Sequence, residues 1–133
     1  MLNPGVYTLA SLQISAAMSL KILTPITGLA GMTSVGLEAN FQYGSGGATC
    51  SLIAATSFDG GTTWRHIARF DFTTATAVKY ANLQTVTSKA VAAYADLAAE
   101  GVNDQLLGDQ LAALIVSTGT YASTVASLRA SVR

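Results

Sequence analysis

Few residues in this chain of 133 could carry chemistry. It holds seven acidic residues, a single histidine, His66, and a single cysteine, Cys50. One stretch stands out: Ser-Phe-Asp-Gly-Gly-Thr-Thr-Trp at 57–64 fits the pattern S-x-D-x-G-x-T-W at every fixed position. Positioned carboxylates serve as acids, bases and nucleophiles in glycoside hydrolysis. Asp59 in this motif is therefore either a candidate catalytic carboxylate or part of a well-built turn.

The local physics of the motif favours the turn. An aspartate commonly accepts hydrogen bonds from the backbone of its own turn, and glycine adopts positive φ without strain. A threonine suits the returning strand, and a tryptophan places a large ring against the sheet. The motif predicts a structural turn made by Ser57, Asp59, Gly60, Gly61, Thr63 and Trp64.

This stretch resembles the Asp-box of sialidases and related glycan-active proteins, where the box lies away from the catalytic centre. Sialidase chemistry uses several arginines on the substrate carboxylate, a tyrosine nucleophile with a glutamate partner, and an acid. This chain has only four arginines and one box. Common glycosidases need two positioned carboxylates, and no spacing here selects a pair. We assign no catalytic residue and expect a protein that is not an enzyme.

Other catalytic arrangements lack residues. A Ser-His-Asp triad would have to run through His66, whose alternation with Trp64 and Ala68 predicts a packed imidazole. One histidine and one cysteine cannot supply the ligands of a zinc site. The glycines in 44–47 precede a strand-like segment without lysine, so they predict a hairpin turn and no phosphate loop. We expect no metal, no cofactor and a quiet buried thiol at Cys50.

Composition points to a subunit of an assembly. Half of the residues are hydrophobic, only 11% are charged, and the formal net charge is zero. Net charge normally keeps proteins apart, so this surface favours a homo-oligomer, a trimer being one expected form. No cluster of basic residues suits nucleic acid. No apolar run suits a membrane span, and the N-terminus lacks a secretory signal pattern. A lone cysteine fits the reducing cytoplasm of a bacterial host.

Alternation of period two dominates the chain and predicts antiparallel strands with one face on a core. Turns recur about every ten residues, which favours a sandwich or a barrel. The turn at 44–47 predicts one hairpin, and 117–120 predicts another. Strands are expected at 37–43, 48–56, 64–72, 77–86, 111–116 and 121–132. In 64–72 the core face should hold Trp64, Ala68, Phe70 and Phe72, opposite Arg65, Arg69 and Asp71.

We therefore expect an all-β protein: one antiparallel β-sandwich domain over 1–133, jelly-roll-like in topology. Two regions are less regular. Residues 1–18 are expected to form an N-terminal arm, within which 6–18 fit either a strand or a short helix. Residues 88–107 combine alanines with Gly101-Val102-Asn103-Asp104, which predicts a long loop with at most one helical turn. Such a long connection in a small domain is often functional.

Three further segments carry a family resemblance: the turn Tyr43–Gly47, the hairpin Thr56–Thr74 and the ending Leu107–Tyr121. Their combination, YGSGG, TSxDGGxTW, LGDxL and TGTY, resembles a family of small proteins encoded by alphaproteobacterial tailed phages and prophages. The likeness covers roughly 38–130. The N-terminal extension and the alanine-rich segment 88–104 depart from it.

The resemblance implies a virion protein, and three functions follow as expectations. The first is a non-enzymatic decoration or cement protein that binds the major capsid protein and stabilises the head. The second is a subunit of the tail or the head–tail connector, bound to other virion proteins. The third is a glycan-binding β-sandwich module that stacks sugar on Trp64, Tyr43 or Tyr80. For the capsid contacts, the segment before Thr24 and the loop 88–107 are the candidates.

Overall fold

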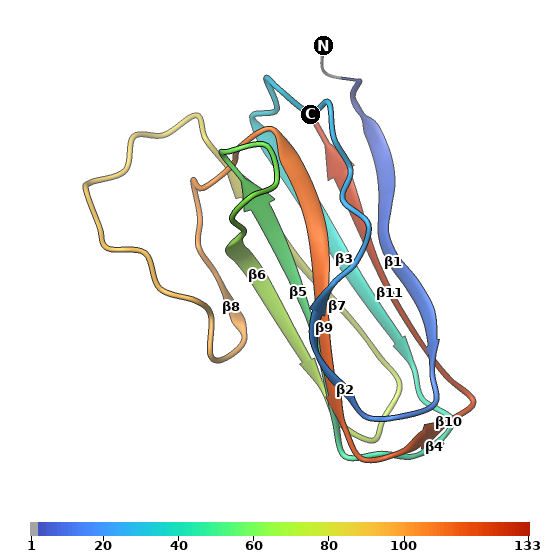
Figure 1. Cartoon of the computed structure of the whole chain (residues 1–133). Helices are drawn as coiled ribbons and strands as arrows, with labels where there is room; N and C mark the ends of the chain where they lie inside the picture. Colours follow the sequence, from blue (N-terminus) through green and yellow to red (C-terminus); the bar gives the residue numbers. More distant parts are fainter. Residues whose placement is uncertain (1–2) are drawn as a thin grey trace.

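Two antiparallel sheets form the framework of the computed structural model, which describes residues 3–133 (Figure 1). Over these residues the chain forms strands and no helix. The strands are β1 (Gly5–Ile14), β2 (Met18–Ile22), β3 (Ser34–Gln42), β4 (Ser45–Gly46), β5 (Thr49–Ser57), β6 (Arg65–Phe72), β7 (Ala77–Gln84), β8 (Gly101–Val102), β9 (Gln110–Thr118), β10 (Tyr121–Ala122) and β11 (Thr124–Val132). Within this part of the chain, no helix is long and apolar enough to span a bilayer.

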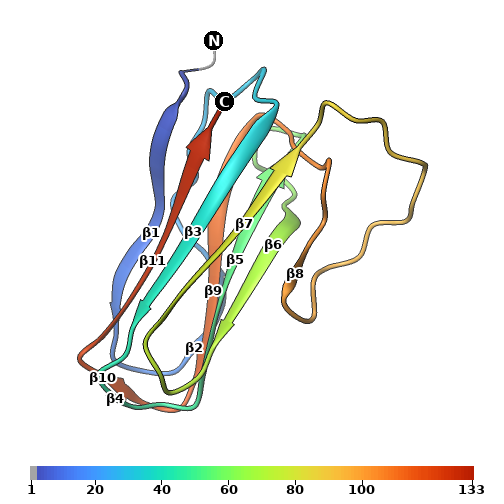
Figure 2. The ribbon, with the colours of Figure 1, turned by 180° about the vertical axis from the view of Figure 1, so that it is seen from behind.

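The strand order identifies the topology. Sheet A runs β1-β11-β3-β7, sheet B runs β2-β9-β5-β6-β8, and β10 pairs with β4 in a small ribbon at one end (Figures 1 and 2). Leaving out the two-residue strands and counting the others along the chain, sheet A holds the first, eighth, third and sixth. Sheet B holds the second, seventh, fourth and fifth. This is the order of a jelly roll, so the predicted jelly-roll-like β-sandwich is confirmed.

Alternation along the strands builds the core between the sheets. In β3, the side chains of Leu37, Ala39 and Phe41 are buried while Glu38 and Gln42 are exposed. Its neighbour β11 alternates in the same way. These side chains meet the inward faces of β5 and β9, which contribute Leu52, Ala54, Leu111, Ala113 and Ile115 to the same cluster. Each large aliphatic side chain removed from water contributes about 1.5–3 kcal/mol to folding.

The two hairpins predicted at 44–47 and 117–120 are wrong. The turn at 44–47 leads from β3 in sheet A to β5 in sheet B, and 119–120 leads from β9 in sheet B to β10 and β11. Only the 57–64 turn joins two paired strands, β5 and β6. Turn residues specify a local reversal, whereas a jelly roll pairs strands that are distant in sequence, so the turn alone does not select the partner.

The N-terminal region is part of the sandwich. Residues 5–14 form β1, which pairs with β11 along its whole length at the edge of sheet A. The side chains of Leu9, Ala10 and Ile14 are buried in the core. The expected N-terminal arm is therefore wrong for 5–14, and of the two forms proposed for 6–18, the strand is correct over 6–14. Residues 1–2 of the expected arm lie outside the described residues.

A bulge in β6 changes which face its residues occupy. Ala68 pairs with Ala54 and His66 pairs with Ala55, so Ile67 is an extra residue between them. Consecutive residues of β5 point to opposite faces, and Ala54 belongs to the core cluster. His66 therefore lies on the outer face of sheet B. The predicted register of His66 with Ala68 is wrong because the alternation rule holds only in an unbroken strand.

Residues 85–109 connect β7 to β9, and we call them the strap. Within it, β8 pairs with β6, and no helical turn forms. The part before β8 projects away from the sandwich as the yellow and gold loop of Figure 1, and Figure 2 shows the same projection from behind. The strap then returns to the outer face of sheet B.

Candidate functional site

The six motif residues lie together in the turn between β5 and β6. The hydroxyl of buried Ser57 accepts the backbone N–H of Gly61 at 2.9 Å and that of Asp59 at 3.3 Å, and donates to Asp59 Oδ1 at 2.9 Å. Asp59 Oδ1 also accepts the backbone N–H of Thr63 at 2.9 Å, and Oδ2 accepts the Thr63 hydroxyl at 2.6 Å. The two glycines adopt positive φ, and Trp64 is half-buried directly before β6.

These bonds define what Asp59 can do. Hydrogen bonds from the Thr63 hydroxyl, the Thr63 backbone and Ser57 lower the pKa of Asp59 to about 2. The carboxylate is therefore ionised at neutral pH, and both its oxygens are occupied by donors of its own turn. The geometry supports a group that holds the turn closed.

The YGSGG and TGTY segments of the family resemblance meet at one end of the sandwich. Tyr121 pairs with Gly46 in the β4–β10 ribbon, and its hydroxyl donates to the carbonyl of Thr73 at 2.7 Å. The Tyr43 hydroxyl donates to the Gly46 carbonyl at 2.9 Å. The Tyr43 and Tyr121 rings lie edge to face with centroids 6.1 Å apart. These two tyrosines close the core.

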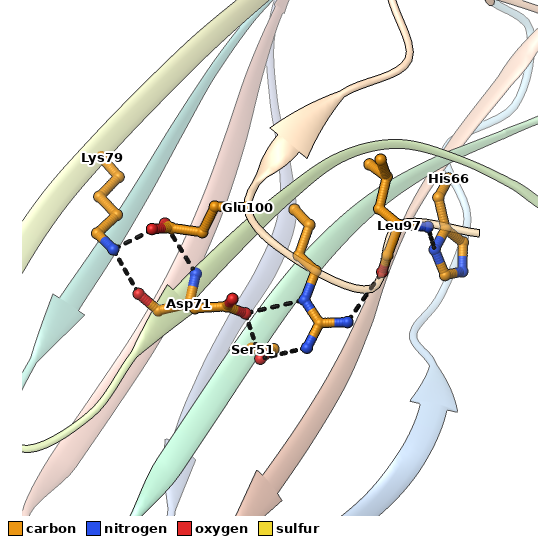
Figure 3. Close-up of polar contacts among 7 residues, drawn as sticks. Ser51, His66, Asp71, Lys79, Leu97 and Glu100 are labelled. Carbon is orange, nitrogen blue, oxygen red and sulfur yellow. Dashed lines mark hydrogen bonds and ion pairs between the residues drawn. The ribbon is translucent and has the colours of Figure 1, made fainter. Parts of the chain in front are cut away.

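A second polar cluster joins the strap to β6, and Figure 3 shows part of it. Its centre is His66, whose side chain is only 8% exposed. The backbone N–H of Leu97 donates to His66 Nδ1 at 3.1 Å, and the amide of Asn103 donates to the His66 carbonyl at 2.8 Å. The backbone N–H of His66 donates to the Tyr94 hydroxyl at 2.6 Å. The strap thus contacts His66 through three different atoms.

The imidazole is held neutral. Burial lowers the pKa of His66, nearby Asp96 raises it and Arg69 lowers it, with a net downward shift. Since Nδ1 accepts a backbone N–H, the ring proton lies on Nε2, and that atom is 3.9 Å from Asp96 Oδ1. A neutral imidazole is therefore required for the Leu97 contact.

Arg69 extends the cluster along β6. Its guanidinium donates to Asp71 Oδ1 at 2.9 Å, to the Leu97 carbonyl at 2.9 Å and to the Ser51 hydroxyl at 3.2 Å. Ser51 in turn donates to Asp71 Oδ1 at 2.6 Å. Burial raises the pKa of Asp71, but the bonds from Ser51 and Arg69 and the charges of Arg69 and Lys79 outweigh it and lower the pKa. Arg69 therefore links both strands of the hairpin to the strap.

Glu100 anchors the far end of the same segment. It accepts the backbone N–H of Asp71 at 3.1 Å and the Lys79 ammonium at 2.7 Å, and Lys79 also donates to the Asp71 carbonyl. Each link is modest alone, and surface ion pairs contribute about 0–1 kcal/mol. Together these contacts hold residues 94–103 against β6 and β7, while the preceding residues project.

Alternation in 64–72 predicted Arg65, Arg69 and Asp71 on the solvent face of β6, but it did not predict this cluster. Its partners come from the irregular strap, where no periodicity indicates which residues turn back to the sheet. The only available signal was the length of the connection itself.

The remaining chemistry-bearing residues lie apart. Cys50 is fully buried in the core, where burial raises the pKa of its thiol to about 12. Over residues 3–133, no group of three or more histidine, cysteine, aspartate or glutamate side chains is placed to hold a metal ion. Compared with protein-family models, curated protein sequences and solved structures, the chain gave no match.

Proposed function

We propose that this protein is a non-enzymatic structural protein of a phage virion. Specifically, we propose a decoration or cement protein that binds the outside of the head and stabilises it. Its partners are other copies of itself and the major capsid protein, and its location is the virion, after synthesis in the bacterial cytoplasm.

Three features support the proposal. The jelly roll is a common architecture of viral capsid domains, although a fold by itself does not define a function. The motif combination at Tyr43–Gly47, Thr56–Thr74 and Leu107–Tyr121 resembles a phage protein family. The low charge and zero net charge suit a subunit whose surface becomes covered.

The observation that carries the proposal is the projecting half of the strap. Its apolar side chains face solvent: Val86 is 71% exposed and Val91 fully so, in a segment that also holds several exposed alanines. Contiguous exposed apolar surface is typical of protein interaction sites. The cluster around His66 and Arg69 anchors the C-terminal end of this loop to sheet B. A presented apolar loop suits insertion against a partner protein.

Co-sedimentation with capsids tests the contact. Capsids of the phage or prophage that encodes the chain are mixed with the wild-type protein, and we expect the protein to pellet with them. Val91→Asp should abolish pelleting, since a charge cannot be desolvated in an apolar contact. Val78→Asp is the matched control, because Val78 is also exposed, at 56%, but lies on the opposite sheet. A wild-type protein that stays in the supernatant contradicts the proposal.

The mass of the purified protein in solution distinguishes the cement role from the connector role. Light scattering after size exclusion should give a trimer for a cement protein at three-fold positions. A closed ring of more subunits would instead favour the tail or head–tail connector. The measurement should be repeated with Val91→Asp, because a loss of the oligomer would place the strap between copies of this chain.

A further inference from the structure

The outer face of sheet A is a second surface without an assigned role. It spans β1, β11, β3 and β7, and Figure 2 views it from outside, with no other segment of residues 3–133 crossing it. A groove of about 510 Å³ crosses this face. Its lining includes the side chains of Val6, Glu38, Tyr80, Asn82 and Arg129, with Gly36 on its floor.

Tyr80 is the most exposed aromatic side chain of the groove. Its side chain is 85% exposed at the middle of β7, the highest value for any aromatic residue described. The other two aromatic candidates for stacking differ: Trp64 is half-buried at the 57–64 turn, and Tyr43 packs edge to face on Tyr121. A tyrosine ring is a flat apolar surface with a polar edge. A ring left in water does not contribute the stabilisation that its burial would give. The ring is therefore available to a ligand.

Gly36 has no side chain, so nothing rises from the floor of the groove beside this ring. Glycine weakens a strand interior, so its presence there calls for a reason. The backbone supplies none, because the glycines with positive φ among residues 3–133 do not include Gly36. Packing supplies none either: an added Cβ would meet nothing closer than the Ser131 Cβ at 4.0 Å. A remaining reason for glycine within a strand is the close approach of a ligand.

The polar groups around the floor indicate the kind of ligand. Glu38 lies directly between Tyr80 and Arg129 in the register of the sheet, yet no ion pair or hydrogen bond joins Glu38 to Arg129. Their carboxylate and guanidinium groups offer acceptors and donors, and the amide of Asn82 offers both. The two charges cancel, so the groove has no preference for an ionic ligand. From β1 to β7 it is roughly 14 Å wide, three strand spacings.

We propose that this groove binds a neutral oligosaccharide, a role beyond the proposed capsid contact and independent of it. A sugar ring combines an apolar C–H face with a rim of hydroxyl groups. The C–H face stacks on Tyr80 over the open floor at Gly36. The hydroxyl groups donate to Glu38 and accept from Arg129 and Asn82. Nucleic acid would need an excess of positive charge, which this face lacks.

Binding is tested on the full chain with an array of neutral glucans, mannans, galactans and N-acetylglucosamine oligomers. The strongest binder is then titrated while backbone amide signals are followed by NMR. We expect the signals of Gly36 and Tyr80 to shift, and those of the 57–64 turn to stay in place. Absence of binding to every sugar on the array overturns the proposal.

Three variants locate the site. Tyr80→Ala should weaken binding by about tenfold or more, and Tyr80→Phe should retain most of it because the stacking face remains. Gly36→Val should abolish binding by filling the floor, while β-branched valine leaves the strand at least as stable in urea. Val125→Ala, a change elsewhere on the same sheet face, should leave affinity unchanged. Full binding by Gly36→Val, or an oligomer that dissociates in Tyr80→Ala without sugar binding, overturns the proposal.

Discussion

The Nδ1 atom of His66 on β6 accepts a hydrogen bond from the backbone N–H of Leu97 in the strap, at 3.1 Å and across 31 positions of sequence. The contact exists only while the imidazole is neutral, since a protonated ring carries donors on both nitrogens. The charged groups nearest to the ring are Asp96 and Arg69, with opposite effects on its pKa. A single side chain therefore couples the seating of the strap to protonation.

Acidification should loosen the strap. The pKa of His66 in the folded protein lies below its ordinary value of 6.5, so the unfolded chain binds the proton more readily. The contribution of His66 to stability is therefore fully present above pH 6.5 and is lost as the pH falls through the lowered pKa. Hydrogen exchange of the Leu97 amide, corrected for its intrinsic pH dependence, should show protection falling over this range. His66→Gln keeps an acceptor without titrating, and a pH dependence unchanged in this variant would refute the mechanism.

Arg69 should matter more than its exposed neighbour Arg65. Arg69→Ala leaves Asp71, Ser51 and the Leu97 carbonyl without their shared donor, and we expect a loss of about 1–3 kcal/mol of unfolding free energy. Arg69→Lys should recover only part, because one ammonium cannot reproduce the guanidinium fork. Arg65→Ala, which removes a cation–π contact with the Tyr94 ring, should cost about 0.5–1 kcal/mol. Urea unfolding measures all three, and equal losses for the two alanine variants would contradict the assignment.

Gly47 and Gly60 form a matched pair that separates backbone strain from packing. Their φ angles are 70° and 71°. An added Cβ at Gly47 would lie 2.3 Å from the Tyr121 ring, whereas one at Gly60 would meet nothing within 4 Å. Gly60→Ala should cost about 1–2 kcal/mol from the left-handed backbone alone. Gly47→Ala should cost about 1–3 kcal/mol more, from overpacking against the ring. Thermal unfolding of both variants tests this order, and similar melting temperatures would show that the ring shifts freely.

Removal of the N-terminal strand should unfold the protein. Deletion of residues 1–17 eliminates β1, including three core side chains, and exposes the edge of β11. We expect the β-sheet circular dichroism signal to be lost. Two single substitutions provide a finer test. Ile14→Ala should lower the free energy of unfolding by about 2–5 kcal/mol, because Ile14 is fully buried. Val6→Ala, at a position 69% exposed, should stay within about 0.5 kcal/mol. A cooperative transition in the deletion variant would show that β1 is dispensable.

Local patterns in the sequence were sufficient for most of the longer strands and for one turn. Alternation in 37–43 and 121–132 follows from the two-residue period of a strand, so β3 and β11 could be predicted without knowledge of their partners. The motif 57–64 closes on itself, with donors and acceptors at most four positions apart. Interactions of such short range are encoded in adjacent residues, and sequence alone determines them.

Only the tertiary structure decided the partners. Strands β3 and β9 look like members of hairpins, yet each turn carries the chain to the other sheet, because the two sheets must cover each other's apolar faces. One extra residue at Ile67 moved His66 from the predicted core face to the outer face, where the strap meets it. The exposure of Tyr80 beside Gly36 likewise arises from four strands that are distant in sequence. Alternation records only that a strand has two faces; the packing of the whole chain determines what each face meets.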